Sequence, residues 1–155
     1  MIEIRGALKS DIAGMIVVWI EFMDYMTDLD SIFRATDEGH IHFKQYVEKT
    51  IDDDDHLVLV AREKGIVTAF SISQIKTKSP LLKHKRYGYI GYMAVSSGFR
   101  RNSIGESMLK EIQQWVSSRK LERIELNVVA NNIMGYAFWK KHGFADYKHA
   151  LYRNS

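Results

Sequence analysis

The stretch Tyr89-Ile-Gly-Tyr-Met-Ala-Val95 decides how this chain is organised, together with the residues that follow it. Its aromatic and apolar residues predict a strand, which a loop at 96–103 connects to a helix beginning at Ile104. The sequence Arg100-Arg-Asn-Ser-Ile-Gly105 spans the end of that loop. A helix start has unpaired backbone N–H groups and partial positive charge, so small residues there let an anion approach closely. The segment therefore predicts a pyrophosphate cradle.

The loop matches neither of the common phosphate-binding motifs. No Gly-Lys-Ser/Thr follows it, as a Walker loop requires, and the glycine triplet of the dinucleotide-binding fingerprint is missing. A second segment adds information: Asn132-Ile-Met-Gly-Tyr-Ala-Phe-Trp-Lys-Lys-His-Gly-Phe144 predicts a short helix that ends at Gly143. One predicted helix and one predicted strand separate the two segments.

Together, the two segments resemble the GNAT superfamily of acyl-CoA-dependent N-acyltransferases. The first resembles that family's Arg/Gln-x-x-Gly-x-Gly/Ala loop, and the second its Asn-x-x-Ala-x-x-apolar-Tyr-x-x-x-Gly-Phe helix. The resemblance is strong from about Tyr87 to Phe144, and upstream only the order of elements agrees. It implies an α/β fold with a GNAT-type mixed sheet in the order β-α-α-β-β-β-α-β-α-β, a splayed central strand pair and helices on both faces.

The resemblance also implies acetyl-CoA as the co-substrate, held at the strand end, the helix start and the second helix. The residues expected to bind it are Met93, Ala94, Val95, Arg100, Arg101, Asn102, Ser103, Ile104, Gly105, Glu106, Asn132, Gly135 and Trp139. Without the family, Asn132 is explained equally well as a helix cap. Core packing is the corresponding alternative for Phe138 and Trp139.

Three positions depart from the family pattern. Ser103 stands where a glycine is usual, and its amide can still donate provided the backbone needs no positive φ there. Gly135 replaces the usual alanine, which loosens the helix slightly. Trp139 occupies the place of the tyrosine that often protonates the leaving thiolate, and an indole N–H is not a usable acid. We therefore expect that role to be missing from its usual place.

Amine attack on a thioester needs a way to move protons, and the strand before the loop carries no carboxylate. Tyr92, acting alone or through a water, and Tyr136, as a substitute acid, are the candidate catalytic residues. Both are equally typical of aromatic side chains at the edge of a core. A cationic acceptor could be held by acidic residues that are otherwise solvated surface, namely Glu21, Glu125, Asp24, Asp28 and Asp30.

The remaining elements follow from hydrophobic periodicity and turn residues. Ser10 or Asp11 is expected to cap the first helix. The predicted elements are a strand at 2–5, helices at about 12–26 and 37–51, a hairpin of 57–61 with 66–75, a basic loop at 76–86, a strand at 87–95, a helix at 104–118, a strand at 123–129, a helix at 132–141 and an extended tail at 144–153.

Composition restricts the classes of protein. The 155 residues, 46% hydrophobic and 26% charged, predict one globular domain over 1–155 and exclude wholesale disorder. The absence of cysteine excludes disulfides, thiolate metal sites and a cysteine acyl-enzyme. The six histidines are scattered, so we expect no metal. The longest apolar run, 12–20, is too short to span a membrane, and no signal peptide is visible, so the default is a cytoplasmic protein.

These observations predict an N-acetyltransferase that moves acetyl to a primary amine of a small molecule or a peptide, directly in a ternary complex. The alternative is a CoA-binding sensor that kept the cradle and lost catalysis. Acids at 24–30 would favour a cationic acceptor, whereas the loop 76–86 would favour an acidic peptide or a phosphorylated amine. We expect no nucleic-acid or membrane partner, and a homodimer is plausible.

Overall fold

The computed structural model describes residues 1–100 and 103–155, and its elements follow the predicted order as far as the last helix. The strands are β1 (Ile2–Gly6), β2 (His56–Glu63), β3 (Ile66–Thr77), β4 (Arg86–Val95) and β5 (Ile124–Leu126). The helices are α1 (Ile12–Leu29), α2 (Gly39–Thr50), α3 (Ile104–Ser118) and α4 (Ile133–Lys141). Short 3-10 turns are η1 (Lys9–Asp11), η2 (Ser31–Phe33) and η3 (Ser97–Phe99).

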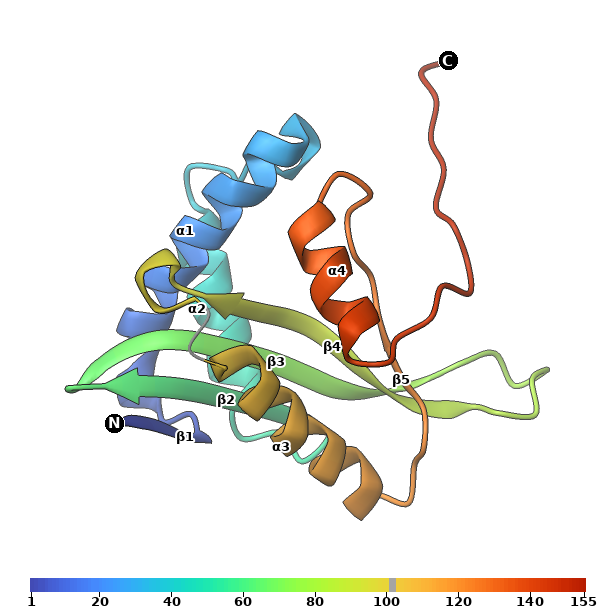
Figure 1. Ribbon diagram of the computed structural model, residues 1–155, viewed down its shortest axis with the longest axis horizontal. Helices are drawn as coiled ribbons and strands as arrows, with labels where there is room; N and C mark the ends of the chain where they lie inside the picture. Colours follow the sequence, from blue (N-terminus) through green and yellow to red (C-terminus); the bar gives the residue numbers. More distant parts are fainter. Residues whose placement is uncertain (101–102) are drawn as a thin grey trace.

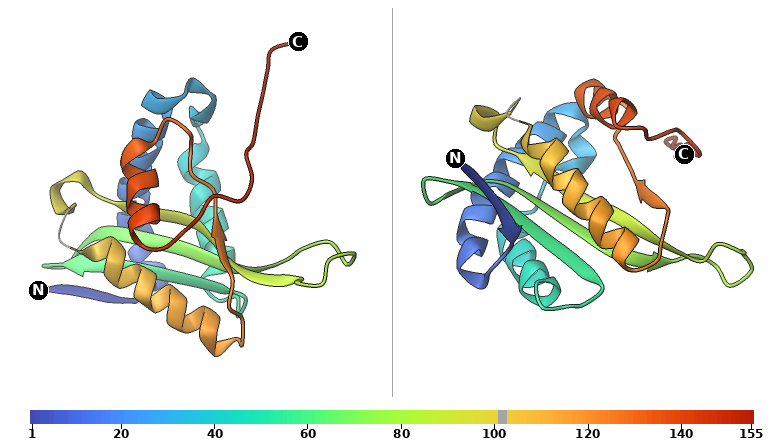
Figure 2. Two further views of the ribbon diagram at one scale, coloured as in Figure 1. Left: turned by 45° about the vertical axis from the view of Figure 1, so that its right-hand side comes forward. Right: turned by 60° about the horizontal axis from the view of Figure 1, so that its bottom comes forward.

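The five strands form one sheet in the order β1-β2-β3-β4-β5, in which neighbours are antiparallel except for the parallel pair β4–β5. Helices cover both faces, with α1 and α2 on one side and α3 and α4 on the other (Figures 1 and 2). This is the mixed α/β architecture that the sequence predicts. No helix within the described ranges combines the length and apolar character that a membrane span needs.

The two faces of the sheet carry separate apolar cores because side chains alternate along each strand. On one face, Phe70 and Ile72 of β3 pack with residues of α1 and α2, including Trp19, whose ring stacks on Phe43 at 5.0 Å. On the other face, Ile90 of β4 packs with the buried stripe of α3. The apolar residues of α1 and α3 that pack in these cores recur with the helical periodicity visible in the sequence.

β4 and β5 separate after a short ladder, and this separation creates the candidate site. Their pairing covers 88–90 and 124–126. Gly88 lets α3 approach, since a Cβ there would lie 2.6 Å from a methyl group of Val116. The register of β4 against β3 then shifts between Tyr92 and Ile90, so Gly91 forms a bulge. Beyond the bulge, β4 pairs with β3 alone among the described strands, which leaves one backbone edge open.

Two predictions about the C-terminal part are wrong. The strand predicted at 123–129 is shorter and forms the edge of the sheet, so the splayed pair is not central. The strand predicted at 144–153 does not form: Phe144 and Tyr147 still contact the body of the molecule, and the tail beyond them extends away from it (Figure 1). Its residues Leu151 and Tyr152 are 92% and 86% exposed. Burying so little apolar surface cannot offset the entropy lost on ordering a strand.

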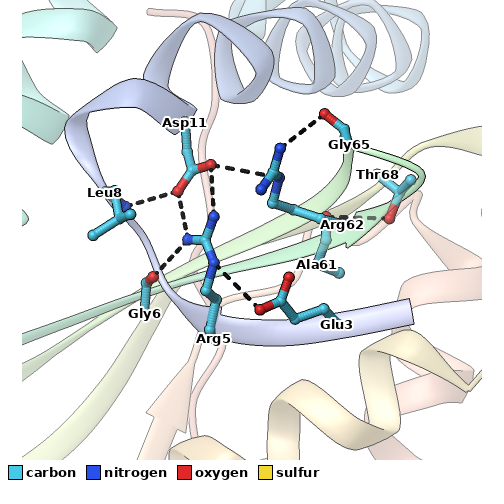
Figure 3. A network of polar contacts seen from close by, with 9 residues as sticks. All are labelled: Glu3, Arg5, Gly6, Leu8, Asp11, Ala61, Arg62, Gly65 and Thr68. Carbon is cyan, nitrogen blue, oxygen red and sulfur yellow. Dashed lines mark hydrogen bonds and ion pairs between the residues drawn. The ribbon is translucent and has the colours of Figure 1, made fainter. Parts of the chain in front are cut away.

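The start of α1 is fixed by a buried carboxylate rather than by the expected side-chain cap. Asp11 accepts no capping bond from α1. Instead it accepts bonds from the Arg5 guanidinium at 2.7 and 3.2 Å and from the Leu8 N–H at 2.8 Å, with Arg62 Nε 3.7 Å away (Figure 3). Burial acts to raise the pKa of Asp11, but these bonds outweigh it and lower the pKa. The cluster joins β1, β2 and the beginning of α1.

Candidate functional site

The beginning of α3 presents backbone N–H groups toward the loop that follows β4. The helical bonding begins with the Ser107 N–H, which donates to the Ser103 carbonyl at 3.0 Å. The N–H groups of Ile104, Gly105 and Glu106 therefore precede the first intrahelical bond. Arg101 and Asn102, which were predicted to contribute to the same cradle, lie outside the described residues.

Ser103 has a left-handed backbone, which is the conformation expected to disfavour a serine at this position. Its φ is 59° and its ψ is 19°, and its side chain makes no capping bond to the described helix start. Left-handed geometry costs a non-glycine residue about 1 kcal/mol. The backbone here has a positive φ. The glycine usual at this position would adopt this φ without strain, whereas serine adopts it at a cost in free energy.

Glu21 of α1 holds the loop between β4 and α3. Its carboxylate accepts bonds from the Ser97 N–H at 2.6 Å and from the Ser96 hydroxyl at 3.0 Å. Burial acts to raise the pKa of Glu21, but the bonds from Ser97 and Ser96 and the charge of Arg100 outweigh it and lower the pKa. Glu21 was predicted as a candidate ligand for a cationic acceptor. In the structure its carboxylate instead binds Ser96 and Ser97 of the loop.

Arg100 turns back toward β4 and α1. Its Nε donates to the Val95 carbonyl at 3.2 Å, and its guanidinium lies 5.5 Å from the centre of the Tyr25 ring. Tyr25 follows Glu21 by one helical turn, so α1 contributes two neighbouring contacts to this loop. Tyr25 was not predicted as a site residue; its i, i+4 spacing places it on the same helix face as Glu21, but its partners Arg100 and Asn132 are distant in the sequence.

Asn132 caps α4, as one of its two interpretations predicted. Its Oδ1 accepts a bond from the Gly135 N–H at 2.9 Å and a second from the Tyr25 hydroxyl at 2.9 Å. The neighbouring Asn131 donates from Nδ2 to the Leu29 carbonyl at 3.1 Å. The end of α1 is thus joined to the beginning of α4, across the gap that opens between β4 and β5.

Predicted cofactor residues on β4, α3 and α4, among them Met93, Gly105 and Trp139, lie together on the α3 face of the sheet. A Cβ on Gly105 would lie 3.2 Å from the Phe138 ring and 3.7 Å from Met93 Sδ. Trp139 contacts the Phe138 and Phe144 rings, with centroids 4.9 and 5.3 Å away, and packs against the apolar cluster of α3. Trp139 thus packs at the edge of this core, and the half-buried Phe138 packs on the Trp139 and His142 rings, while the cofactor role of Trp139 stays a prediction. Val95 lies in the same cluster, whereas Ala94 is buried on the opposite face.

The two candidate catalytic tyrosines lie on different sides of the molecule. Tyr92 packs in an aromatic cluster on the α1 and α2 face, 5.8 Å from Phe22 and Phe43 and 5.9 Å from Phe70. Burial, followed by the proximity of Tyr92, raises the pKa of Tyr46 on α2. The Tyr136 hydroxyl donates to both carboxylate oxygens of Asp146 at 3.0 Å.

The other predicted acids have distinct surroundings. Glu125, 8% exposed, contacts Lys78 Nζ at 2.9 Å, Arg123 Nε at 2.7 Å and the Tyr147 hydroxyl. Burial acts to raise the pKa of Glu125, but these partners outweigh it and lower the pKa from 4.5 to about 2.

Asp30 accepts from the Ile32 N–H at 3.1 Å, whereas Asp24 and Asp28 are exposed. Within the described ranges, no group of three or more His, Asp or Glu side chains is arranged to hold a metal ion.

Comparison with known families and structures gives a consistent result. The sequence model described as "Acetyltransferase (GNAT) family" matches residues 11–144. A predicted acetyltransferase from Clostridium acetobutylicum, solved with acetyl-CoA, has a TM-score of 0.79 at 22% identity, covering 99% of this chain and 96% of the other. A search of curated proteins finds no match.

Two further structures with named acceptors share the fold. An aminoglycoside 6'-N-acetyltransferase from Acinetobacter haemolyticus has a TM-score of 0.78 at 12% identity, covering 99% of this chain and 97% of the other. Glucosamine-6-phosphate N-acetyltransferase from Arabidopsis thaliana has a TM-score of 0.73 at 19% identity, covering 99% and 98%. At these identities the likeness concerns the fold alone.

Proposed function

Since this chain belongs to the acetyltransferase (GNAT) family, we propose that it transfers an acetyl group from acetyl-CoA directly to a primary amine. The observation that carries this proposal is the convergence of two open backbone surfaces. One is the row of N–H groups at the start of α3, and the other is the edge of β4 that β5 leaves free beyond Ile90. Together they suit a ligand that has a diphosphate at one end and an amide-bearing arm.

Acetyl-CoA supplies the activated thioester. The N–H groups of Ser103 to Glu106 would hold its diphosphate, with charge from Arg100 at the rim. Backbone groups of Met93, Ala94 and Val95 would bind the pantetheine arm, and Asn132 would reach it from α4. Asn132 Nδ2 is the atom for this contact, because its Oδ1 already accepts from Gly135 and Tyr25.

In the transfer step, the amine nitrogen forms a bond to the acetyl carbon, the carbon–sulfur bond breaks, and the amine proton leaves. We assign proton acceptance to Tyr92, directly or through a water, since it is the hydroxyl-bearing residue next to the β4 bulge. Tyr136 would supply the thiol proton in place of the tyrosine that Trp139 replaces. Its hydroxyl donates to Asp146, so this bond would have to break before Tyr136 could protonate the thiolate.

One observation favours a second function, a CoA-binding sensor without turnover. Trp139 packs against the α3 cluster, and it carries no acid at the position where relatives commonly have one. CoA thiol is acidic enough to leave without assistance, so the loss of this acid lowers a rate without abolishing the reaction. Transfer therefore stays the first proposal.

Calorimetric titration of acetyl-CoA measures cofactor binding at the cradle independently of the transfer reaction. We expect micromolar binding, and we expect Ser103→Glu to lose it because a carboxylate would face the diphosphate. Ser107→Glu, one turn later on the exposed side of α3, is the matched control and should bind normally. Thiol release with a panel of amines then distinguishes transferase from sensor. Absence of binding by the parent protein would withdraw both functions.

A further inference from the structure

The face of β3 and β4 opposite α3 carries a half-buried strip of cations and aromatic rings. The two strands continue past the helices into a projecting hairpin (Figures 1 and 2). Lys76 Nζ lies 4.3 Å above the centre of the Tyr89 ring, and Lys78 Nζ lies 4.5 Å above that of Tyr87. These four side chains share one face, since Lys76 is the register partner of Tyr87. We call them the strip, and residues 77–86 the arm.

The strip and the arm have one sign of charge. Residues 76–86 include five basic residues and no acidic one: Lys76, Lys78, Lys83, Lys85 and Arg86. Within the described part of the chain, Lys78 pairs with Glu125, while no carboxylate pairs with the other four. Glu125 is itself neutralised further by Arg123. Uncompensated charge of this density attracts an acidic partner and accelerates its association.

The strip ends where β4 and β5 separate. Asn127 Nδ2 donates to the Tyr89 hydroxyl at 2.9 Å, next to the last ladder pair, Ile90 with Leu126. Tyr92 follows on the same face. From Arg86 to Gly91 the strand rises about 17 Å, at about 3.3 Å per residue. A small amine cannot reach both the arm and the gap, whereas an extended peptide can.

We propose that the strip and the arm dock an acidic segment of a peptide or protein acceptor, whose lysine amine reaches the gap between β4 and β5. This substrate class rests on the proposed transferase function. The cations would pair with the carboxylates of the segment, and the rings would provide flat apolar contact. A lipid surface is favoured less, because it would meet the exposed arm tip, Leu81 and Leu82, and leave Lys76 and Lys78 at the base of the arm unused.

Two labelled peptides test the docking by fluorescence anisotropy at low salt. Each is roughly 12 residues long, enough to span the strip, with one lysine near one end and either glutamates or glutamines at the other. The arm variant K83Q/K85Q/R86Q removes three cations. The control variant K44Q/K49Q/K64Q removes three exposed cations from elsewhere on the surface.

We expect the glutamate peptide to bind about tenfold more tightly than the glutamine peptide, since several exposed ion pairs each contribute a small factor. The arm variant should lose this preference and the control variant should keep it. Equal binding of the two peptides, or a preference that survives in the arm variant, overturns the docking site.

Two further readouts separate the competing outcomes. Sedimentation with phosphatidylserine vesicles is measured for the parent and for L81S/L82S. Vesicle binding that needs the leucines, without any peptide preference, overturns the proposal and makes the arm a lipid contact.

Acetylation of the peptide lysine is then followed with acetyl-CoA. Arm-dependent peptide binding without transfer to any amine would support the docking site and overturn the transferase function.

Discussion

At the start of α4, the Asn132 side chain fills the space that a side chain on Gly135 would need. A Cβ on Gly135 would lie 2.4 Å from Asn132 Nδ2, and the Gly135 N–H donates to Asn132 Oδ1 at 2.9 Å. The glycine that departs from the family pattern is therefore what allows this asparagine to fold over its own helix. The same side chain also receives the Tyr25 hydroxyl.

Gly135→Ala should change stability little by itself. Alanine gains about 1 kcal/mol of helix propensity, and displacing the Asn132 cap loses about 1 kcal/mol. In an Asn132→Ala background the cap is already absent, so the same substitution should stabilise by about 1 kcal/mol. Urea unfolding of the four proteins measures this coupling. Equal effects in both backgrounds would show that the two side chains do not compete.

Ser103→Gly should stabilise the protein by about 1 kcal/mol, because glycine adopts the observed φ of 59° without strain. Ser107→Gly makes the same chemical change inside α3 and should destabilise by about 0.5 kcal/mol. Thermal unfolding distinguishes them by the opposite signs of the change. A loss of stability in both variants would contradict the strain at Ser103.

Glu21→Gln should weaken acetyl-CoA binding about fivefold, because one amide oxygen cannot replace a carboxylate that holds the Ser96 hydroxyl, the Ser97 N–H and the charge of Arg100. Asp24→Asn removes one negative charge from an exposed position on the same helix and should bind as the parent does. Calorimetry provides both affinities. Equal weakening would indicate an effect of overall charge rather than of the loop.

Glu125 should make folding sensitive to acid. Its pKa is lowered in the fold from 4.5 to about 2, so its stabilisation is complete above pH 4.5 and is lost as the pH falls toward 2. The difference corresponds to about 3 kcal/mol. Glu125→Gln should be less stable at pH 7 and should lose less stability across this interval. Glu122→Gln, at an exposed neighbour, should follow the parent; denaturant unfolding at several pH values decides.

The sequence predicted those elements whose apolar pattern is local. The bounds of α3 were predicted at 104–118 and observed there, because Ile104, Met108 and Ile112 form a regular buried stripe. β5 was predicted too long, since its residues favour strands but its pairing depends on where β4 diverges. Such a divergence is set by packing between distant elements, which local propensity does not contain.

The sequence predicted the backbone N–H groups of the cradle in outline, but it did not predict the side-chain contacts that hold the cradle in place. The N–H groups before Ser107 and the Asn132 cap follow from motifs within a few residues. Glu21 and Ser97 are 76 residues apart, and Tyr25 and Asn132 are 107 apart. Contacts over such separations leave no periodic signal in one sequence. The catalytic assignments of Tyr92 and Tyr136 remain predictions.

The three-pair ladder between β4 and β5 has a consequence for how the native state fluctuates. Backbone amides in β5 are protected from hydrogen exchange by few bonds, whereas β3 lies between two long partners. The segment after residue 124 therefore exchanges through local opening, at a free energy below that of global unfolding. A ligand that bound β4 and α4 only while this segment is closed would slow its exchange, because it would raise the free energy of local opening by RT ln(1 + [L]/Kd).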